Sequence, residues 1–140
     1  MVPINYLAVL ASTIMMMVLG FLWYGPIFGK QWQSLMGFTA EDMNEAKAKG
    51  MVKTYAIMAL GALVMSFVLA HSLIFASNYM KVTGVVAGLE VGIWNWLGFI
   101  VPVSIGSVLW DGKPWKYWVI TYGYNLVGML TMAAILGAWM

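Results

Sequence analysis

Long stretches without a charged residue alternate with short charged segments along this chain. The four longest uncharged runs cover residues 1–29, 54–80, 91–110 and 117–140. A membrane-spanning helix needs about 20 apolar residues, because the hydrocarbon layer is roughly 30 Å thick and each helical residue rises about 1.5 Å. A β-barrel would need segments of about 10 residues in which apolar and polar positions alternate, and these runs do not alternate. The pattern predicts an all-α polytopic membrane protein, a four-transmembrane-helix bundle with one membrane domain over 1–140.

Prolines and charges set the expected ends of the helices, which we place at about 4–24, 54–79, 82–110 and 115–139. Pro3 suits a first helical turn, where its missing N–H is not needed. The Gly25-Pro26 pair should stop the first helix, since the residue before a proline avoids helical angles. In the third helix, Pro102 cannot donate a hydrogen bond to the carbonyl of Gly98, which predicts a kink.

The segment between the first two spans has its own helix signal over about 40–49. Thr39 can cap this helix, and Asp42 stands three residues later, as in a weak capping box. Acidic residues lie near its start and Lys47 near its end, which suits the helix dipole. We therefore expect a short cytoplasmic helix, which is either a solvated connector or a docking surface for a partner.

Composition narrows the class of protein further. Hydrophobic residues make up 63% of the chain and charged residues 9%, whereas a soluble domain carries about 25% charged residues. An ordinary cytosolic enzyme and a nucleic-acid-binding domain are therefore excluded, and the net charge of +2 does not suggest a nucleic-acid partner. The expected partner is the lipid bilayer. Because the chain has no cysteine, disulfides and thiolate metal sites are also excluded.

Lysines and aromatic residues predict the orientation. Six lysines fall in the loops 30–53 and 111–116, and only Lys81 falls on the opposite side. Since lysine-rich short loops stay in the cytoplasm, both termini are predicted outside a bacterial inner membrane. Tryptophan and tyrosine collect at headgroup depth. The expected anchors at the inner face are Trp23, Tyr24, Trp32, Trp110, Trp115 and Trp118. Those expected at the outer face are Tyr6, Tyr79 and Trp139, and the deeper residues Trp94, Trp96, Tyr122 and Tyr124 should pack between helices or line a cavity.

His71 and Glu90 are the ionisable residues expected to lie within the hydrocarbon. They stand ten residues before and nine residues after Lys81. If the second and third helices form a tight hairpin, both side chains are deep and can meet across it, as a structural hydrogen bond or a proton relay. If residues 74–90 are an external loop, both are shallow.

Two asparagines and a glycine series are the next candidates. Asn95 and Asn125 should bond across helices, or they contact a substrate in a polar path. Gly84, Gly88 and Gly92 share one helix face, which lets another backbone approach within the chain or in a homo-oligomer. No catalytic constellation is present, and we expect neither a metal nor a cofactor; the 13 methionines read as packing residues.

A faint internal repeat links two helix ends. Trp23-Tyr24-Gly25 and Trp110-Asp111-Gly112 each end a span, and each is followed by a Gly-Lys-x-Trp segment. Two parallel helical hairpins would produce this pattern. The chemistry of the membrane interface, which favours tryptophan, glycine and lysine at helix ends, would produce it equally well.

Three motifs carry a resemblance to a known family. They are Gly20-Phe-Leu-Trp23-Tyr24-Gly25-Pro26-Ile-Phe28-Gly29-Lys30-Gln-Trp32 followed by Met36-Gly37, then Asn95-Trp96-Leu97-Gly98-Phe99, and Tyr122-Gly123-Tyr124-Asn125. The chain resembles, over nearly its whole length, a family of small bacterial membrane proteins catalogued as domain of unknown function 1761. The resemblance implies four spans and assigns no catalytic residue.

Two functional hypotheses follow. The first is a non-enzymatic membrane protein that acts through helix packing and assembly as a homo-oligomer. The alternative is a small proton-linked transporter or channel of unknown substrate, with His71 and Glu90 in its path beside Asn95 and Asn125. An enzyme acting on lipid or quinone comes third.

Overall fold

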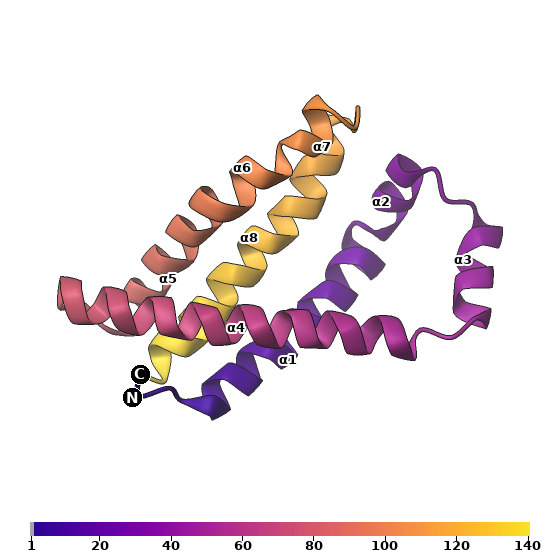
Figure 1. Ribbon diagram of the computed structural model, residues 1–140. Coiled ribbons are helices and arrows are strands. Elements are labelled where there is room, and N and C mark those ends of the chain that lie inside the picture. Colours follow the sequence, from indigo (N-terminus) through magenta and orange to yellow (C-terminus); the bar gives the residue numbers. More distant parts are fainter. Residues whose placement is uncertain (1) are drawn as a thin grey trace.

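The computed structural model describes residues 2–140, and these residues form helices and loops without a strand (Figure 1). The helical elements are α1 Tyr6–Leu22, η1 Trp23–Ile27, α2 Gly29–Met36, α3 Ala40–Ala48, α4 Val52–Met80, α5 Gly84–Asn95, η2 Trp96–Ile100, α6 Val101–Ser104, α7 Gly106–Leu109 and α8 Trp115–Ala138. Four helical stretches are long and apolar enough to cross a membrane: Tyr6–Ile27, Val52–Met80, Gly84–Leu109 and Trp115–Ala138. The all-α fold with four spans is thereby confirmed.

The first span differs from the prediction at both ends. Pro3 precedes the helix, and Asn5 caps it instead, because the Asn5 side-chain oxygen accepts hydrogen bonds from the backbone N–H groups of Leu7 and Ala8 at 3.1 and 3.2 Å. At the other end, the expected stop at Gly25-Pro26 is wrong. The chain passes through Pro26 in a π-helical turn and reaches Ile27.

The π turn explains how the helix accommodates this proline. The Phe28 N–H donates to the carbonyl of Trp23, five residues earlier, at 2.8 Å. This wider turn needs no N–H from Pro26 and relieves the crowding that a proline ring causes in an α-helix. Helix α2 follows directly, and a Cβ at Gly29 would lie 2.6 Å from the Tyr24 carbonyl oxygen. The long uncharged runs do not indicate α2, because this helix is short and lies between the first two of them.

The short helix α3 confirms the loop prediction, ending at Ala48 where the pattern placed its end at residue 49. The Asp42 N–H donates to the Thr39 hydroxyl oxygen at 3.1 Å, and the Thr39 N–H and hydroxyl both donate to the Asp42 carboxylate, at 2.8 and 2.7 Å. Stabilisation of the charged carboxylate by these two bonds, the backbone bond foremost, lowers the pKa of Asp42 from its usual value of 3.8. One exposed ion pair joins Lys49 to Glu45 at 3.6 Å.

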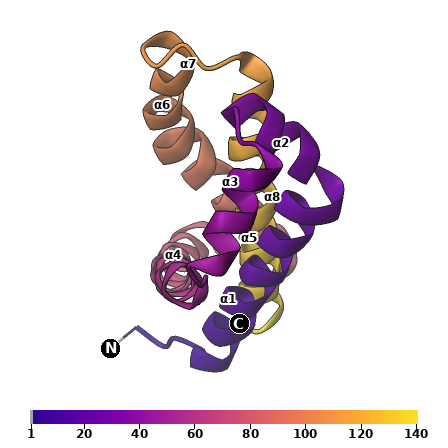
Figure 2. The same ribbon diagram turned by 90° about the vertical axis from the view of Figure 1, so that its right-hand side faces the viewer.

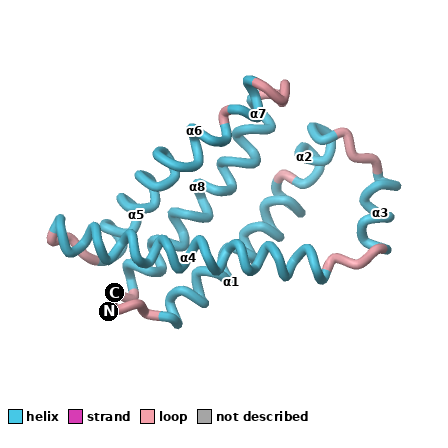
Figure 3. The backbone as a smooth tube through the Cα atoms, viewed as in Figure 1, coloured by secondary structure: helices cyan, strands magenta, loops and turns pink. Residues whose placement is uncertain are grey.

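Helix α8 lies at the centre of the bundle, between α1 on one side and α5–α7 on the other (Figure 1). Helix α4 runs obliquely across this layer and contacts α1, α5 and α8; in Figure 2 it is seen nearly end-on. The tube in Figure 3 shows the chain ends meeting at one end of the bundle, where the Asn5 side-chain amide donates to the Trp139 carbonyl at 3.1 Å. This arrangement fits an even number of crossings.

Small residues and serine hydroxyls hold the helices together in the core. Ser12 donates to the Met132 carbonyl at 3.3 Å, which joins α1 to α8. Ser66 donates to the Val9 carbonyl at 3.1 Å, which joins α4 to α1. Both serines are completely buried. Such interhelical bonds matter in a bilayer, because apolar side chains gain little by leaving lipid for protein.

The glycine series packs within the chain. A Cβ at Gly88 would overlap the carbonyl oxygen of Ala133 on α8, and one at Gly92 would lie 3.2 Å from the Ala133 Cβ. One turn beyond, a Cβ at Gly137 would overlap the Gly84 carbonyl oxygen. Of the two uses left open for this face, the structure shows the intramolecular one.

Candidate functional site

The two π turns share a sequence and a position. Residues Trp23–Ile27 read Trp-Tyr-Gly-Pro-Ile, and Trp96–Ile100 read Trp-Leu-Gly-Phe-Ile, so both follow Trp-x-Gly-x-Ile. They lie in the first and third spans, which run in the same direction on the two sides of α8 (Figure 1). π turns are rare and often mark functional sites.

Each π turn begins with a tryptophan that bonds to the backbone of α8. The Trp23 indole N–H donates to the Ile120 carbonyl at 2.9 Å, and the Trp96 indole N–H donates to the Tyr122 carbonyl at 3.0 Å. Residues two positions apart are separated by about 200° around the axis of a helix. The two indoles therefore hold α8 from opposite sides.

Further aromatic side chains complete this arrangement, which we call the aromatic collar. Its members are Trp23, Tyr24, Phe28, Trp32, Trp96, Trp118, Tyr122 and Tyr124. The Tyr24 ring meets those of Trp32 and Tyr124 edge-on, with centroids 5.4 and 5.2 Å apart. The Tyr124 hydroxyl donates to the Met16 carbonyl at 3.2 Å. Trp118 donates its indole N–H to the Ser104 hydroxyl at 2.9 Å.

The collar brings together the three motifs that carry the family resemblance, which are far apart in the sequence. Its groups offer hydrogen bonds and ring contacts, and tyrosine is its only ionisable residue type. The hydroxyl oxygen of Thr121, one residue before the collar member Tyr122, is buried without a hydrogen-bond partner among the described residues. The hydrogen bonds of the collar join the first and third spans to α8.

The predicted anchors divide into two groups. Trp110 is 87% exposed and Trp115 is 55% exposed, as an interfacial tryptophan should be. The indole N–H groups of Trp23 and Trp118 instead donate hydrogen bonds to acceptors inside the protein. The internal repeat predicted from the sequence compared the helix ends at Trp23 and Trp110. In the structure, the counterpart of Trp23 is Trp96, because each of these two residues begins a π turn.

In the part of the chain that the structure describes, residues 2–140, neither an ion pair nor a hydrogen bond joins His71 to Glu90. The His71 Nδ1 lies 2.9 Å from the Phe67 carbonyl of its own helix, and the ring sits between those of Phe67 and Phe75. Both phenylalanines are exposed, so this side of α4 faces away from the bundle. Glu90 is exposed too, and it lines a small hollow between α4 and α5.

The two asparagines bond within their own helices rather than across them. Asn95 donates to the Val91 carbonyl at 2.8 Å, and Asn125 donates to the Thr121 carbonyl at 3.0 Å. The expectation of cross-helix amide bonds is wrong, because an acceptor four residues earlier is always within reach of a helical asparagine. Among the deep aromatic residues, Trp96 and Tyr124 pack inside as expected, whereas Trp94 is 69% exposed and points away from the bundle.

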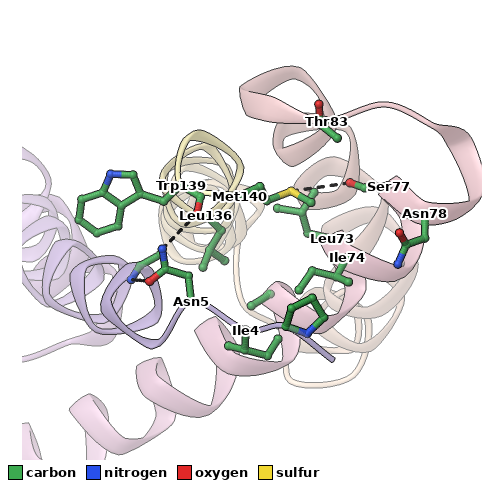
Figure 4. A pocket seen from close by; sticks show the side chains of 13 residues that line it. Ile4, Asn5, Leu73, Ile74, Ser77, Asn78, Thr83, Leu136, Trp139 and Met140 are labelled. Carbon is green, nitrogen blue, oxygen red and sulfur yellow. Dashed lines mark hydrogen bonds between the residues drawn. The ribbon is translucent and has the colours of Figure 1, made fainter. Parts of the chain in front are cut away.

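A cavity of about 490 Å³ opens at the end of the bundle that carries both termini (Figure 4). It lies between the start of α1, the last turns of α4 and the end of α8. None of the four polar residues predicted as a site lines it. Sequence reasoning missed its polar residues Asn5, Ser77, Asn78 and Thr83, although the clustering of asparagine, serine and threonine at span ends was a usable signal.

A family model described as "Protein of unknown function (DUF1761)" matches residues 7–137 of the chain. The matched residues include both π turns and the part of α8 that they hold. No curated protein and no solved structure matches the chain.

Proposed function

The chain belongs to the DUF1761 family of proteins of unknown function, and we propose that it is a non-enzymatic membrane protein that acts as a homo-oligomer. We place it in a bacterial inner membrane with both termini outside. The six lysines in the loops at one end of the bundle support this orientation, as against Lys81 at the other. The sequence offers one histidine and no cysteine for chemistry at a catalytic site.

The observation that carries the proposal is the exposed carboxylate of Glu90 within the third span. A charged group in the hydrocarbon costs at least about 2.5–3.5 kcal/mol, so such groups pair with others. Within residues 2–140, Glu90 has no hydrogen-bond or ion-pair partner, and His71 lies in the neighbouring span with its side chain on an outward face. A second copy of the chain can supply the oppositely charged partner that Glu90 and His71 lack within their own chain.

Depth and symmetry make this pairing possible. Glu90 stands six residues after Gly84, about 9 Å along α5, and His71 stands nine residues before Met80, about 14 Å along α4. Helix α4 crosses the other helices obliquely (Figure 1). Its residues therefore descend less per turn than those of α5, and we infer that the two side chains lie at similar depths. A two-fold axis normal to the membrane preserves depth, so Glu90 of each copy can pair with His71 of the other.

The transporter hypothesis is the weaker one. It requires a water-reachable path along the four polar candidates, and the large cavity is lined by other residues. The glycine face is occupied by α8 and so is not the surface of assembly.

Cysteine cross-linking in a bilayer tests the proposal cleanly, because the natural chain contains no cysteine. Chains carrying Glu90→Cys and chains carrying His71→Cys, distinguished by tags, are reconstituted together and oxidised. We expect a disulfide-linked pair containing one chain of each kind. The matched control replaces His71→Cys with Ile14→Cys, a 56% exposed residue that stands about 12 Å along α1 from Tyr6 and so lies at a comparable depth on another helix. Mixed pairs no more abundant than in the control, or a monomeric mass for the untagged protein in nanodiscs, would refute assembly through this surface.

A further inference from the structure

We propose that the cavity at the terminal end of the bundle, which we call the terminal pocket, binds an uncharged amphiphile from the bilayer. The ligand class is a single alkyl chain that ends in a hydroxyl or carbonyl group. This inference goes beyond the proposed assembly and rests on different side chains.

The floor of the terminal pocket is apolar and large enough for a lipid chain. Ala8 of α1, Leu73 and Ile74 of α4, and Leu136 of α8 contribute to it (Figure 4). Its volume of about 490 Å³ lies within the range of roughly 300–1,000 Å³ that is usual for small-molecule sites. The three helices converge here, so the pocket is formed by the tertiary structure and not by one element.

The rim is polar, and part of its hydrogen-bonding capacity is unused. Asn5 is occupied by the Trp139 carbonyl and by the first turn of α1, and Ser77 donates to the Met140 sulfur at 3.7 Å. Thr83 precedes α5 at the capping position, where a threonine usually binds a backbone N–H, yet its side chain makes no capping bond. Thr83 and the exposed Asn78 both line the pocket, and no hydrogen bond of either side chain is formed among the described residues.

The charge of the lining residues selects an uncharged head group. No lysine, aspartate or glutamate lines the terminal pocket. A phosphate or carboxylate placed there would find no countercharge among the lining residues. A hydroxyl or carbonyl group needs only the hydrogen bonds that Asn78 and Thr83 offer.

The aromatic residues place the rim at headgroup depth. Tyr6, Tyr79 and Trp139 are all exposed at this end of the bundle, Tyr79 by 89%, and exposed tyrosine and tryptophan mark the membrane interface. An amphiphile dissolved in the bilayer keeps its own polar end at the same depth. It can therefore enter the terminal pocket with its chain toward the apolar floor and its head at the polar rim.

Photolabelling tests the proposal with hexadecanol that carries a diazirine and an alkyne. The intact protein is labelled in nanodiscs, and the labelled peptides are identified by mass spectrometry. We expect saturable labelling of pocket residues that unlabelled hexadecanol displaces, while hexadecyl phosphate and palmitate displace it at least about tenfold less well. Ile74→Trp should fill the pocket and abolish this labelling, whereas Ile57→Trp, at an exposed position of α4, should not.

The hydroxyl at the rim is tested separately. Thr83→Val preserves shape, removes no capping bond, and should weaken displacement by hexadecanol about two- to tenfold, the effect of one neutral hydrogen bond. Thr54→Val, at an exposed position of α4, is its control. Labelling confined to lipid-facing positions, or unchanged by Ile74→Trp in a variant with native helix content, would overturn the proposal. Equal or better displacement by hexadecyl phosphate would overturn its uncharged ligand class.

Discussion

Replacing Gly88 by alanine tests the closest approach between α5 and α8. The added Cβ would overlap a backbone carbonyl oxygen, that of Ala133, which cannot rotate away as a flexible side chain does. Helix α5 must therefore retreat from α8 by about 1 Å or more to restore an ordinary contact. Overpacking of this kind costs about 1–3 kcal/mol of unfolding free energy.

Gly61→Ala is the matched control, since it lies inside α4 and a Cβ there meets nothing within 4 Å. Both substitutions gain the same helix propensity, about 0.5–1 kcal/mol. The difference between the two variants therefore isolates the overlap with Ala133. We expect Gly88→Ala to unfold at a lower mole fraction of dodecyl sulfate than Gly61→Ala, when mixed micelles are titrated and helicity is followed by circular dichroism.

A double substitution sharpens this test. Gly137→Ala would overlap the Gly84 carbonyl oxygen at the same interface. Once α5 has moved away to accommodate one methyl group, the second costs less, so the combined loss should be smaller than the sum of the two single losses. If Gly88→Ala proves as stable as Gly61→Ala, the packing of α5 on α8 described above is incorrect.

Two further predictions concern the collar and the loop helix. Trp23→Phe removes the indole N–H that binds the Ile120 carbonyl and should lower the free energy of unfolding by about 0.5–1.5 kcal/mol in the same titration. Trp110→Phe, at an exposed position, is its control and should leave the free energy of unfolding unchanged. Equal effects of the two substitutions would contradict the hydrogen bond of Trp23 to α8. Because folding lowers the pKa of Asp42, its contribution to α3 is complete above 3.8 and is lost as the pH falls through the lowered value. The protection factor of the Asp42 amide, which is its exchange rate relative to the intrinsic rate at the same pH, should therefore stay constant above that pH and fall below it. A fall between pH 7 and 5 would contradict the capping box.

The helices were predictable where local chemistry decides them. Uncharged runs of sufficient length place all four spans, because the cost of charge in hydrocarbon acts on each segment by itself. The capping box of α3 was readable for the same reason, since Thr39 and Asp42 bond only to each other and to their own turn. The continuation of the first span past Pro26 was not predicted, because a π turn is a rare solution that sequence rules exclude in favour of a helix end.

The candidate site was less predictable, although part of its signal was present. Trp-x-Gly-x-Ile occurs twice, at Trp23 and at Trp96, and would have pointed to two equivalent turns. His71 and Glu90 do not pair across the hairpin, because the rotation of α4 places the half-buried His71 ring between Phe67 and Phe75 of its own helix. The spacing of residues along a spanning helix sets their depth in the membrane, but it does not set which neighbouring helix a side chain faces.

The sequence by itself therefore determined the class of protein, its four crossings and its loop helix, since composition and local hydrogen bonding require nothing from distant residues. The tertiary structure alone decided which tryptophans bind α8 and which face outward, where the glycine face packs, and that a pocket forms where α1, α4 and α8 converge. The physical reason is that helices in a bilayer find little hydrophobic gain in choosing one partner over another. Their arrangement depends instead on close backbone contact and on a few specific hydrogen bonds, which exist only once the helices are in place.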